Sequence, residues 1–354
     1  MNATAAALHV GAAVALSATL QAQSVPQHHD LTISGIILGA NGAPLPFSTA
    51  SLDGTAIERF SNERGEFVLA GIAPGVYHLR VRQLGFSALD TVITLQSGTP
   101  VTGLRMVLSP VAFKLATVTV REKSCVVSAA ISGPASDFGM ILTELRKNAE
   151  RERLLAHNYP FEYRIAKSFE SDDSRVAPVP SGTDTIAYRS DARPRYVPGG
   201  LVRRDETRPS PNRIMVIPVL GDIGDPEFLR THCFTYNGRV KDAGAVTHRI
   251  DFSPTGSIRA ADVEGSAYLD GTTFVVRRAV FRLTRPQSLK PPVQDLEVTT
   301  RYREIFPGVT VVGDVSSIQT VNEAFTRYVR VIETQRLVDY RFLNGQPGDT
   351  LRHE

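Results

Sequence analysis

Cysteine is scarce in this sequence, and the motifs that usually carry enzyme chemistry are missing. Only Cys125 and Cys233 occur among the 354 residues, with no Cys-x-x-Cys pair and no Cys/His spacing typical of zinc ligands. None of the eight histidines stands in an HExxH motif, and neither a GxSxG elbow nor a phosphate-binding glycine loop is present. We therefore predict a protein without enzymatic activity, bound metal or cofactor.

Charge of one sign is also not gathered into a long run. Lys and Arg number 39 against 36 Asp and Glu, which gives a formal net charge of +3. A nucleic-acid-binding surface normally shows a concentrated basic stripe, so we expect no nucleic-acid partner. One local basic patch lies in a proline-rich stretch and comprises Arg193, Arg195, Arg203, Arg204 and Arg208. It is a candidate surface for an anionic glycan, a lipid headgroup or a protein, and a solvated loop is the alternative.

Residues 1–22 contain no Lys, Arg, Asp or Glu and carry an apolar run that ends near Ala22. This pattern is typical of a secretory signal peptide, although no basic residue precedes the run. A membrane anchor and a buried helix are the alternatives, but the run is short for a span, and no other segment approaches that length. We predict an exported protein that is periplasmic, outer-membrane-associated or secreted, with no membrane span once the signal is removed.

Export would place both cysteines in an oxidising compartment, where a single disulfide between Cys125 and Cys233 is expected. Such a bond closes a loop of roughly a hundred residues and is worth about 4 to 5 kcal/mol in the chain-entropy model. Two unrelated buried thiols are the alternative.

Residues 31–109 predict a small β-sandwich. Tyr77, Leu79 and Val81 alternate with polar neighbours, which is the period-two pattern of a half-buried strand. Similar short runs recur between turns rich in glycine and proline. Several short strands at this spacing are typical of a sandwich.

Two stretches of this region, SGIILGANGAPLPFSTASLDGT and SNERGEFVLAGIAPGVYHLRVRQLGF, resemble the carboxypeptidase regulatory-like domain. The matching positions are Gly35, Gly42, Pro44, Gly65, Phe67, Gly75, Tyr77 and Gly85. The resemblance implies a prealbumin-like sandwich, also found ahead of the plug in some TonB-dependent receptors, and a non-catalytic accessory role. We expect Gly65 and Gly75 to take positive φ in tight turns, with Phe67 and Tyr77 as inward anchors.

Residues 110–135 read as a linker, and an amphipathic helix is predicted after it. Its apolar face comprises Phe138, Ile141, Leu142, Leu145, Ala149 and Leu155. Ser136 and Asp137 are the candidate N-caps. Charged residues cover the rest of the helix, and we expect them to be solvated while the apolar face packs on a sheet.

The remainder of the domain at 136–354 predicts an antiparallel meander. The expected strands are 159–165, 185–188, 213–219, 246–252, 263–269, 274–283, 296–306, 310–318 and 325–342. The hairpin GSAYLDGTT at 265–273 resembles the hairpins of curved half-barrel envelope proteins such as the lipoprotein carriers. The order of signal, sandwich, helix and hairpin also resembles a group of uncharacterised bacterial envelope proteins. Together these resemblances imply a mainly β fold with a curved, half-barrel-like sheet, and no activity.

Two pairs of polar residues offer weak candidates for chemistry. His232 and Cys233 point to opposite faces if they lie on a strand, so they predict a cystine beside an exposed or capping histidine better than a nucleophile and its base. Asp262 and Asp270 flank one strand and suggest an acid/base pair, but Asp270 followed by Gly271 is an ordinary hairpin signal.

A carboxylate cluster at Asp222, Asp225 and Glu227 offers oxygens to calcium. Its spacing lacks the alternation of an EF-hand loop, and Asp225 followed by Pro226 fits the cap and first position of a short helix equally well.

Three functional hypotheses follow. The first is a non-enzymatic envelope protein that binds a ligand or partner on the concave face of its C-terminal β domain, with the sandwich as an accessory module. The second is a structural adaptor of an outer-membrane or TonB-linked assembly. The least favoured is a hydrolase with an unrecognised site.

Overall fold

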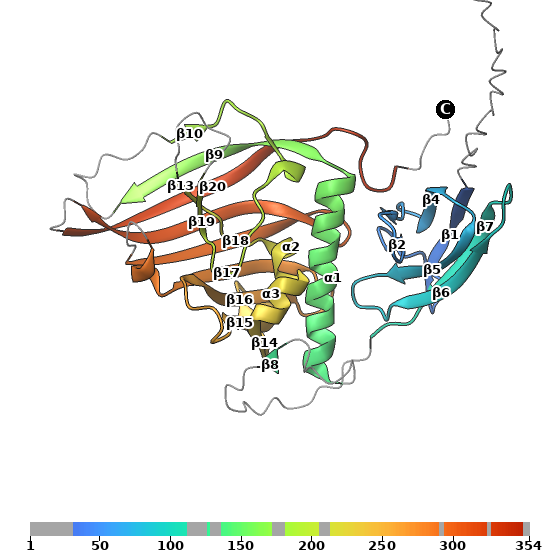
Figure 1. Ribbon diagram of the computed structural model, residues 1–354, viewed down its shortest axis with the longest axis horizontal. Helices are drawn as coiled ribbons and strands as arrows, with labels where there is room; N and C mark the ends of the chain where they lie inside the picture. The colour runs from blue at the N-terminus through green and yellow to red at the C-terminus, as the bar shows by residue number, and fades with distance from the viewer. Residues whose placement is uncertain are drawn as a thin grey trace, which may run out of the picture.

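The computed structural model describes residues 31–111, 126–127, 136–171, 181–204, 213–289, 294–323 and 327–349. The chain forms two β modules with a long helix, α1 (Asp137–Asn158), between them (Figure 1). Within the described residues, no helix combines the length and apolar character needed to cross a membrane. The predicted signal segment at 1–22 lies outside the described residues.

The N-terminal module is a sandwich of two small sheets, as predicted. Its strands are β1 (Leu31–Gly39), β2 (Thr49–Leu52), β3 (Glu58–Phe60), β4 (Glu66–Ile72), β5 (Gly75–Arg82), β6 (Leu89–Leu95) and β7 (Val101–Leu108). One sheet has the order β4-β1-β7, with β1 and β7 parallel, and the other has the order β3-β2-β5-β6. The inward residues of the alternating strands form a core between the sheets, in which Leu79 and Val81 are fully buried.

Of the two turn glycines singled out in the sequence, only Gly65 behaves as expected. Its φ is +76°, and an added Cβ would lie 2.6 Å from the carbonyl oxygen of Ile37. The expectation for Gly75 is wrong, because this residue starts strand β5 and is not among the residues with positive φ. Phe67 is buried as an anchor, whereas Tyr77 is half-buried and its hydroxyl donates to the carbonyl of Ala73.

The second module is built on one large, open, curved antiparallel sheet (Figure 1). Its strands are β8 (Val126–Val127), β9 (Phe161–Ser171), β10 (Gly182–Thr183), β11 (Tyr188–Arg189), β14 (His232–Asp242), β15 (Ala245–Pro254), β16 (Asp262–Asp270), β17 (Val276–Thr284), β18 (Asp295–Phe306), β19 (Val309–Glu323) and β20 (Arg327–Phe342). Strands β14 to β20 follow one another as the predicted meander, and β9 pairs with β20 at the end of it.

Some strand boundaries differ from the prediction. The stretch 213–219 is a strand only over β13 (Arg213–Met215), which pairs with β12 (Val202–Arg204). Pro218 has no N–H to donate to a ladder, and helix α2 (Leu220–Ile223) begins two residues later. The strand expected at 274–283 begins only at Val276, because Phe274 adopts φ +59° in the preceding turn.

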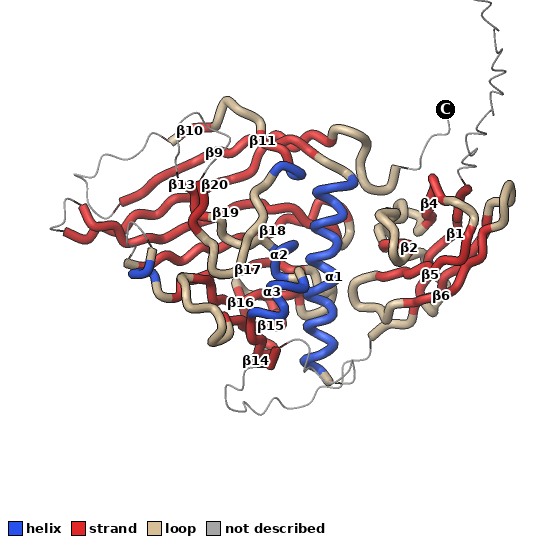
Figure 2. Tube along the Cα trace, viewed as in Figure 1, coloured by secondary structure: helices blue, strands red, loops and turns tan. Residues whose placement is uncertain are grey.

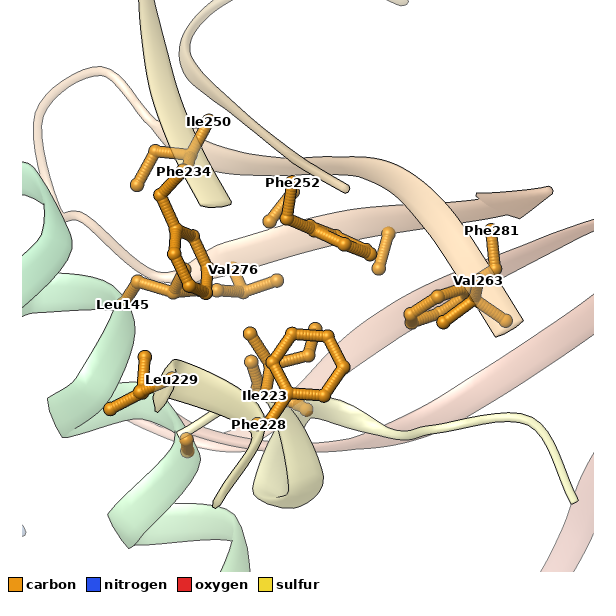
Figure 3. Packing of buried hydrophobic residues seen from close by; sticks show 14 of the residues in the cluster. Leu145, Ile223, Phe228, Leu229, Phe234, Ile250, Phe252, Val263, Val276 and Phe281 are labelled. Atoms are coloured by element: carbon orange, nitrogen blue, oxygen red, sulfur yellow. The ribbon is translucent and has the colours of Figure 1, made fainter. Parts of the chain in front are cut away.

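The concave side of the large sheet is covered by helices. The apolar side chains of α1, α2 and α3 (Pro226–Thr231) pack against those of β14 to β18 (Figure 3). Leu145 and Phe228 from the helices meet Phe234, Ile250 and Phe252 from the sheet in this core. The predicted packing of one amphipathic helix on the sheet is therefore confirmed, and the Ser136 hydroxyl caps it by accepting from the Gly139 N–H at 3.0 Å.

The charged face of α1 was expected to be solvated, but the sandwich packs against it (Figure 2). The Glu144 and Lys147 side chains are only 1% and 6% exposed. Glu144 accepts from the Gly85 N–H, and Lys147 donates to the carbonyl oxygens of Gln83 and Phe86 as well as to Glu144. The helix therefore has two buried faces, one apolar toward the sheet and one polar toward the sandwich.

Candidate ligand-binding site

A pocket of about 590 Å³ opens at the junction of the two modules. One wall comes from β3 and β4 of the sandwich and includes Arg59 and Glu66. The second comes from the end of α1, with Asn158 and Tyr159, and the third is the segment 344–349 that follows β20. A pocket of this size is within the usual range for small-molecule sites.

The end of α1 is tied to the sandwich at this pocket. The Phe60 N–H donates to the Tyr159 hydroxyl oxygen at 3.2 Å, and the Asn158 amide donates to the Glu58 carbonyl at 2.8 Å. The rings of Phe60 and Tyr159 lie 5.6 Å apart at a tilt. Burial raises the pKa of the Tyr159 hydroxyl, so it is protonated at neutral pH and keeps a hydrogen to donate.

The third wall is a turn that is stabilised by two hydrogen bonds between Gln346 and Asp349. The Gln346 N–H donates to the Asp349 carboxylate at 2.9 Å, and the Asp349 N–H donates back to the Gln346 carbonyl at 3.1 Å. Gly348 has φ +87°, and an added Cβ would lie 3.1 Å from the Phe47 ring, so the turn rests directly on the sandwich. Phe47 in turn stacks on Phe306 of β18, with ring centroids 4.9 Å apart.

The charged groups of the pocket differ in how they are satisfied. Glu66 accepts from the Asn62 amide and the Arg64 guanidinium, and these hydrogen bonds lower its pKa. Arg59 donates only to the neighbouring Glu58 carbonyl, at 2.8 Å. Across the described part of the chain, Arg59 and Asp349 take part in no ion pair. The pocket thus presents one unpaired cation and one unpaired anion.

A second pocket of about 350 Å³ lies between α1 and the segment around 190–225. Two residues of the predicted basic patch line it, but acidic neighbours meet them: Arg195 pairs with Asp225 at 2.6 Å and Arg193 with Asp222 at 3.6 Å. Burial raises the pKa of Glu152 in this wall to about 7. The charge of Arg193 and a hydrogen bond from the Gly221 N–H lower the pKa but do not offset the effect of burial.

The other members of the predicted patch are not brought together with this pocket. Arg203 lies on β12 and is half-buried. The side chain of Arg204 and the whole of Arg208 lie outside the described residues. The patch as a binding surface for an anionic partner therefore stays a prediction.

The acidic cluster of Asp222, Asp225 and Glu227 lies at the starts of two short helices, which was the alternative to a calcium site. Asp225 is the N-cap of α3, accepting from the Glu227 N–H at 2.9 Å, and Pro226 occupies the first helical position. Asp222 accepts from the Val219 N–H at the start of α2. Within the described ranges, no group of three or more His, Cys, Asp or Glu side chains is arranged to hold a metal ion.

Asp262 and Asp270 do not form an acid/base pair. Asp270 accepts from the N–H groups of Thr272 and Thr273 in the hairpin turn, as the turn signal indicates. Asp262 is fully buried and instead accepts from the Tyr196 hydroxyl and from the Gly199 N–H, the latter at 2.9 Å. The sequence reasoning missed the partnership with Tyr196, because the two residues are far apart along the chain and carry no motif.

His232 is the C-cap residue of α3, as one of the two expectations had it, but it is fully buried rather than exposed. Its ring stacks on Phe228 with centroids 3.8 Å apart, and burial lowers its pKa despite the Asp262 charge. Cys233 follows on β14 directly opposite Val127 of β8. Cys125 lies outside the described residues, so the bond between the two cysteines stays a prediction.

Residues 32–109 match the family model of the carboxypeptidase regulatory-like domain. The resemblance of the sandwich to that domain is confirmed. The regulatory-like domain contributes β3 and β4 to the junction pocket, and its Gln83–Phe86 turn receives the polar face of α1.

Three solved structures are among those to which parts of the chain are similar. A LolA superfamily protein from Nitrosomonas europaea covers 56% of this chain and 94% of its own, at 11% identity and a TM-score of 0.31. A DUF1329 family protein from Desulfovibrio piger covers 57% and 93%, at 9% identity and a TM-score of 0.31. A type II cohesin–X-dockerin complex from Acetivibrio cellulolyticus matches 23% of this chain at 21% identity and a TM-score of 0.19, and only 58% of that chain is covered. No curated protein matches the chain in sequence.

Proposed function

We propose that this chain is a non-enzymatic, exported cell-envelope protein that binds a ligand in the pocket between its regulatory-like domain and its C-terminal β domain. The observation that carries the proposal is the pocket of about 590 Å³ whose walls come from both modules. The sandwich then contributes directly to the binding site and is more than an accessory attached to it.

The position of the helices supports this choice of site over the concave face of the sheet. Side chains of α1, α2 and α3 fill the concave side over β14 to β18, where Leu220, Ile223 and Phe228 are fully buried against the sheet. A ligand there would have to displace a packed core, which costs several kcal/mol. The junction pocket requires no such displacement.

Hydrogen bonds and ion pairs through α1 also hold the two modules in a fixed relation. Besides the contacts of Lys147, Arg82 of the sandwich pairs with Glu150 of α1 at 2.5 Å, and Arg151 of α1 donates to the Gly308 carbonyl at 2.8 Å. Walls that are already in place before binding reduce the entropy that a ligand must overcome.

Mass spectrometry of the protein purified from its native envelope without reductant tests the proposal. Extracted small molecules are compared between the wild type and Gln346→Trp, which places an indole at the exposed third wall, with Gln96→Trp on a distant exposed turn as the matched control. We expect a ligand in the wild type and in Gln96→Trp that is lost from Gln346→Trp. The same spectra report export through a chain that begins near Gln23, and the disulfide through a mass two hydrogens lighter.

A chain that carries no reproducible ligand in any of the three proteins would overturn the binding proposal and favour the structural-adaptor hypothesis. An uncut chain with two free thiols would overturn the predicted export and the disulfide together.

A further inference from the structure

We propose that the ligand of the junction pocket is a short zwitterionic peptide, whose carboxylate pairs with Arg59 and whose ammonium group pairs with Asp349. The inference rests on the proposed function, since it names the ligand class of the same pocket. The fold leaves two charges of opposite sign unpaired among the described residues of this pocket, and carboxamide side chains line the same pocket.

The unpaired charges distinguish this pocket from its neighbour. Arg59 has no carboxylate partner within the described residues, and its only hydrogen bond goes to the Glu58 carbonyl. Among the described residues, the Asp349 carboxylate accepts only from the Gln346 backbone N–H. In the second pocket, by contrast, Asp222 and Asp225 already pair with arginines. A ligand with one charge of each sign would complete the first pocket but would have to break ion pairs in the second.

The two charges come from different modules, and both act on the Tyr159 hydroxyl. Arg59 lies on β3, and Asp349 lies in the turn after β20. The pKa of Tyr159, raised chiefly by burial, is lowered by the charge of Arg59 and raised by that of Asp349, so both charges lie within range of this hydroxyl. A ligand that occupies the pocket beside Tyr159 therefore meets both a cation and an anion.

Besides the charges, the pocket offers groups that suit a peptide bond. Asn158 donates one amide hydrogen to the Glu58 carbonyl, and its side-chain oxygen remains as an acceptor. Asn344 and Gln346 add exposed carboxamides to the third wall. A carboxamide presents one acceptor beside its donors, which matches the N–H and C=O of a peptide unit.

A neutral saccharide is the main competing ligand class, because its hydroxyls also suit carboxamides. It would, however, leave both Arg59 and Asp349 without an opposite charge, whereas a zwitterion supplies a carboxylate to the first and an ammonium group to the second. The charges therefore favour the peptide.

Isothermal titration of the full chain with trialanine, N-acetyl-trialanine, trialanine amide and the neutral disaccharide cellobiose tests the inference. We expect trialanine to bind best and each capped form to bind about tenfold more weakly, because each cap removes one charged contact. Arg59→Gln should weaken trialanine and the N-acetyl form by about the same factor and leave the amide unchanged. Asp349→Asn should weaken trialanine and the amide and leave the N-acetyl form unchanged.

Arg105→Gln and Glu63→Gln, at exposed positions that do not line the pocket, are matched controls and should not change binding. Binding of cellobiose without trialanine would overturn the zwitterion and leave the pocket as a ligand site. The zwitterionic ligand would also be overturned if neither cap and neither charge variant changed the affinity. Absence of binding up to millimolar trialanine overturns the inference, and an empty pocket in the extraction experiment overturns the proposed function as well.

Discussion

Replacing Lys147 gives the most direct test of the junction between the modules. Its ammonium group donates to the carbonyl oxygens of Gln83 (3.0 Å) and Phe86 (2.5 Å) and to the Glu144 carboxylate (2.7 Å), with the side chain only 6% exposed. Lys147→Met keeps most of the apolar stem and removes all of these donors. Glu144 is then left buried without its cation, and such a loss typically lowers the free energy of unfolding by about 3 to 5 kcal/mol.

Urea unfolding of the full chain at pH 7 measures this loss. The double variant Glu144→Gln/Lys147→Met leaves no buried charge at the site, so we expect it to recover most of the lost stability. Lys241→Met on β14 is the matched control and should stay within about 0.5 kcal/mol of the wild type. A Lys147→Met variant as stable as this control, or a double variant no better than the single one, would refute the reasoning.

The pH dependence of the same variant gives a second readout. Burial raises the pKa of Glu144, and the charge of Lys147 opposes that rise. Without Lys147 the folded-state pKa rises further. A carboxyl with a raised folded-state pKa stabilises the fold below its unfolded pKa, and this contribution is lost as the pH rises through the folded pKa. The deficit of Lys147→Met should therefore shrink between pH 7 and pH 5, and a deficit that grows would contradict the assignment.

Two further predictions concern the second module. Burial raises the pKa of Glu152 from 4.5 to about 7. We therefore expect Glu152→Gln to stabilise the fold by up to about 3 kcal/mol at pH 8 and to have little effect below pH 4.5. Unfolding measured from pH 4 to pH 8 checks this, and a stability difference that does not depend on pH counts against it. Gly265→Ala would place a Cβ 1.9 Å from the Val280 carbonyl oxygen, so we expect a loss of about 3 kcal/mol or more, whereas Gly256→Ala, with nothing within 4 Å, should be nearly neutral in thermal unfolding.

Local signals account for the parts of the fold that were predicted correctly. Alternation at Tyr77, Leu79 and Val81 predicts strand β5, and the apolar spacing from Phe138 to Ala149 predicts α1. These signals depend only on which side chains share a face, so neighbours in the sequence are sufficient to reveal them. The same holds for the Asp225 cap and the Asp270 turn, where the partners are two or three residues away.

Errors arose where a partner lies far away in the sequence. Glu144 and Lys147 look like a solvated helix face, because nothing near them indicates that the Gln83–Phe86 turn covers it. His232 is the C-cap of α3, as one expectation had it, but it is buried rather than exposed, with its Nε2 atom 4.0 Å from the carboxylate of Asp262 on β16. A single sequence holds no periodic signal for such contacts, since they depend on how separately formed elements pack.

The sequence by itself determined the mainly β architecture, the sandwich predicted at residues 31–109 and the long helix that precedes the meander. Tertiary structure alone decided where the junction pocket forms. Arg59 and Asp349 lie near opposite ends of the chain and meet at one pocket only after the polar face of α1 docks the sandwich against the β domain. The physical reason is that strands and helices show a side-chain periodicity among neighbouring residues. A pocket instead depends on how segments that are distant in sequence pack together.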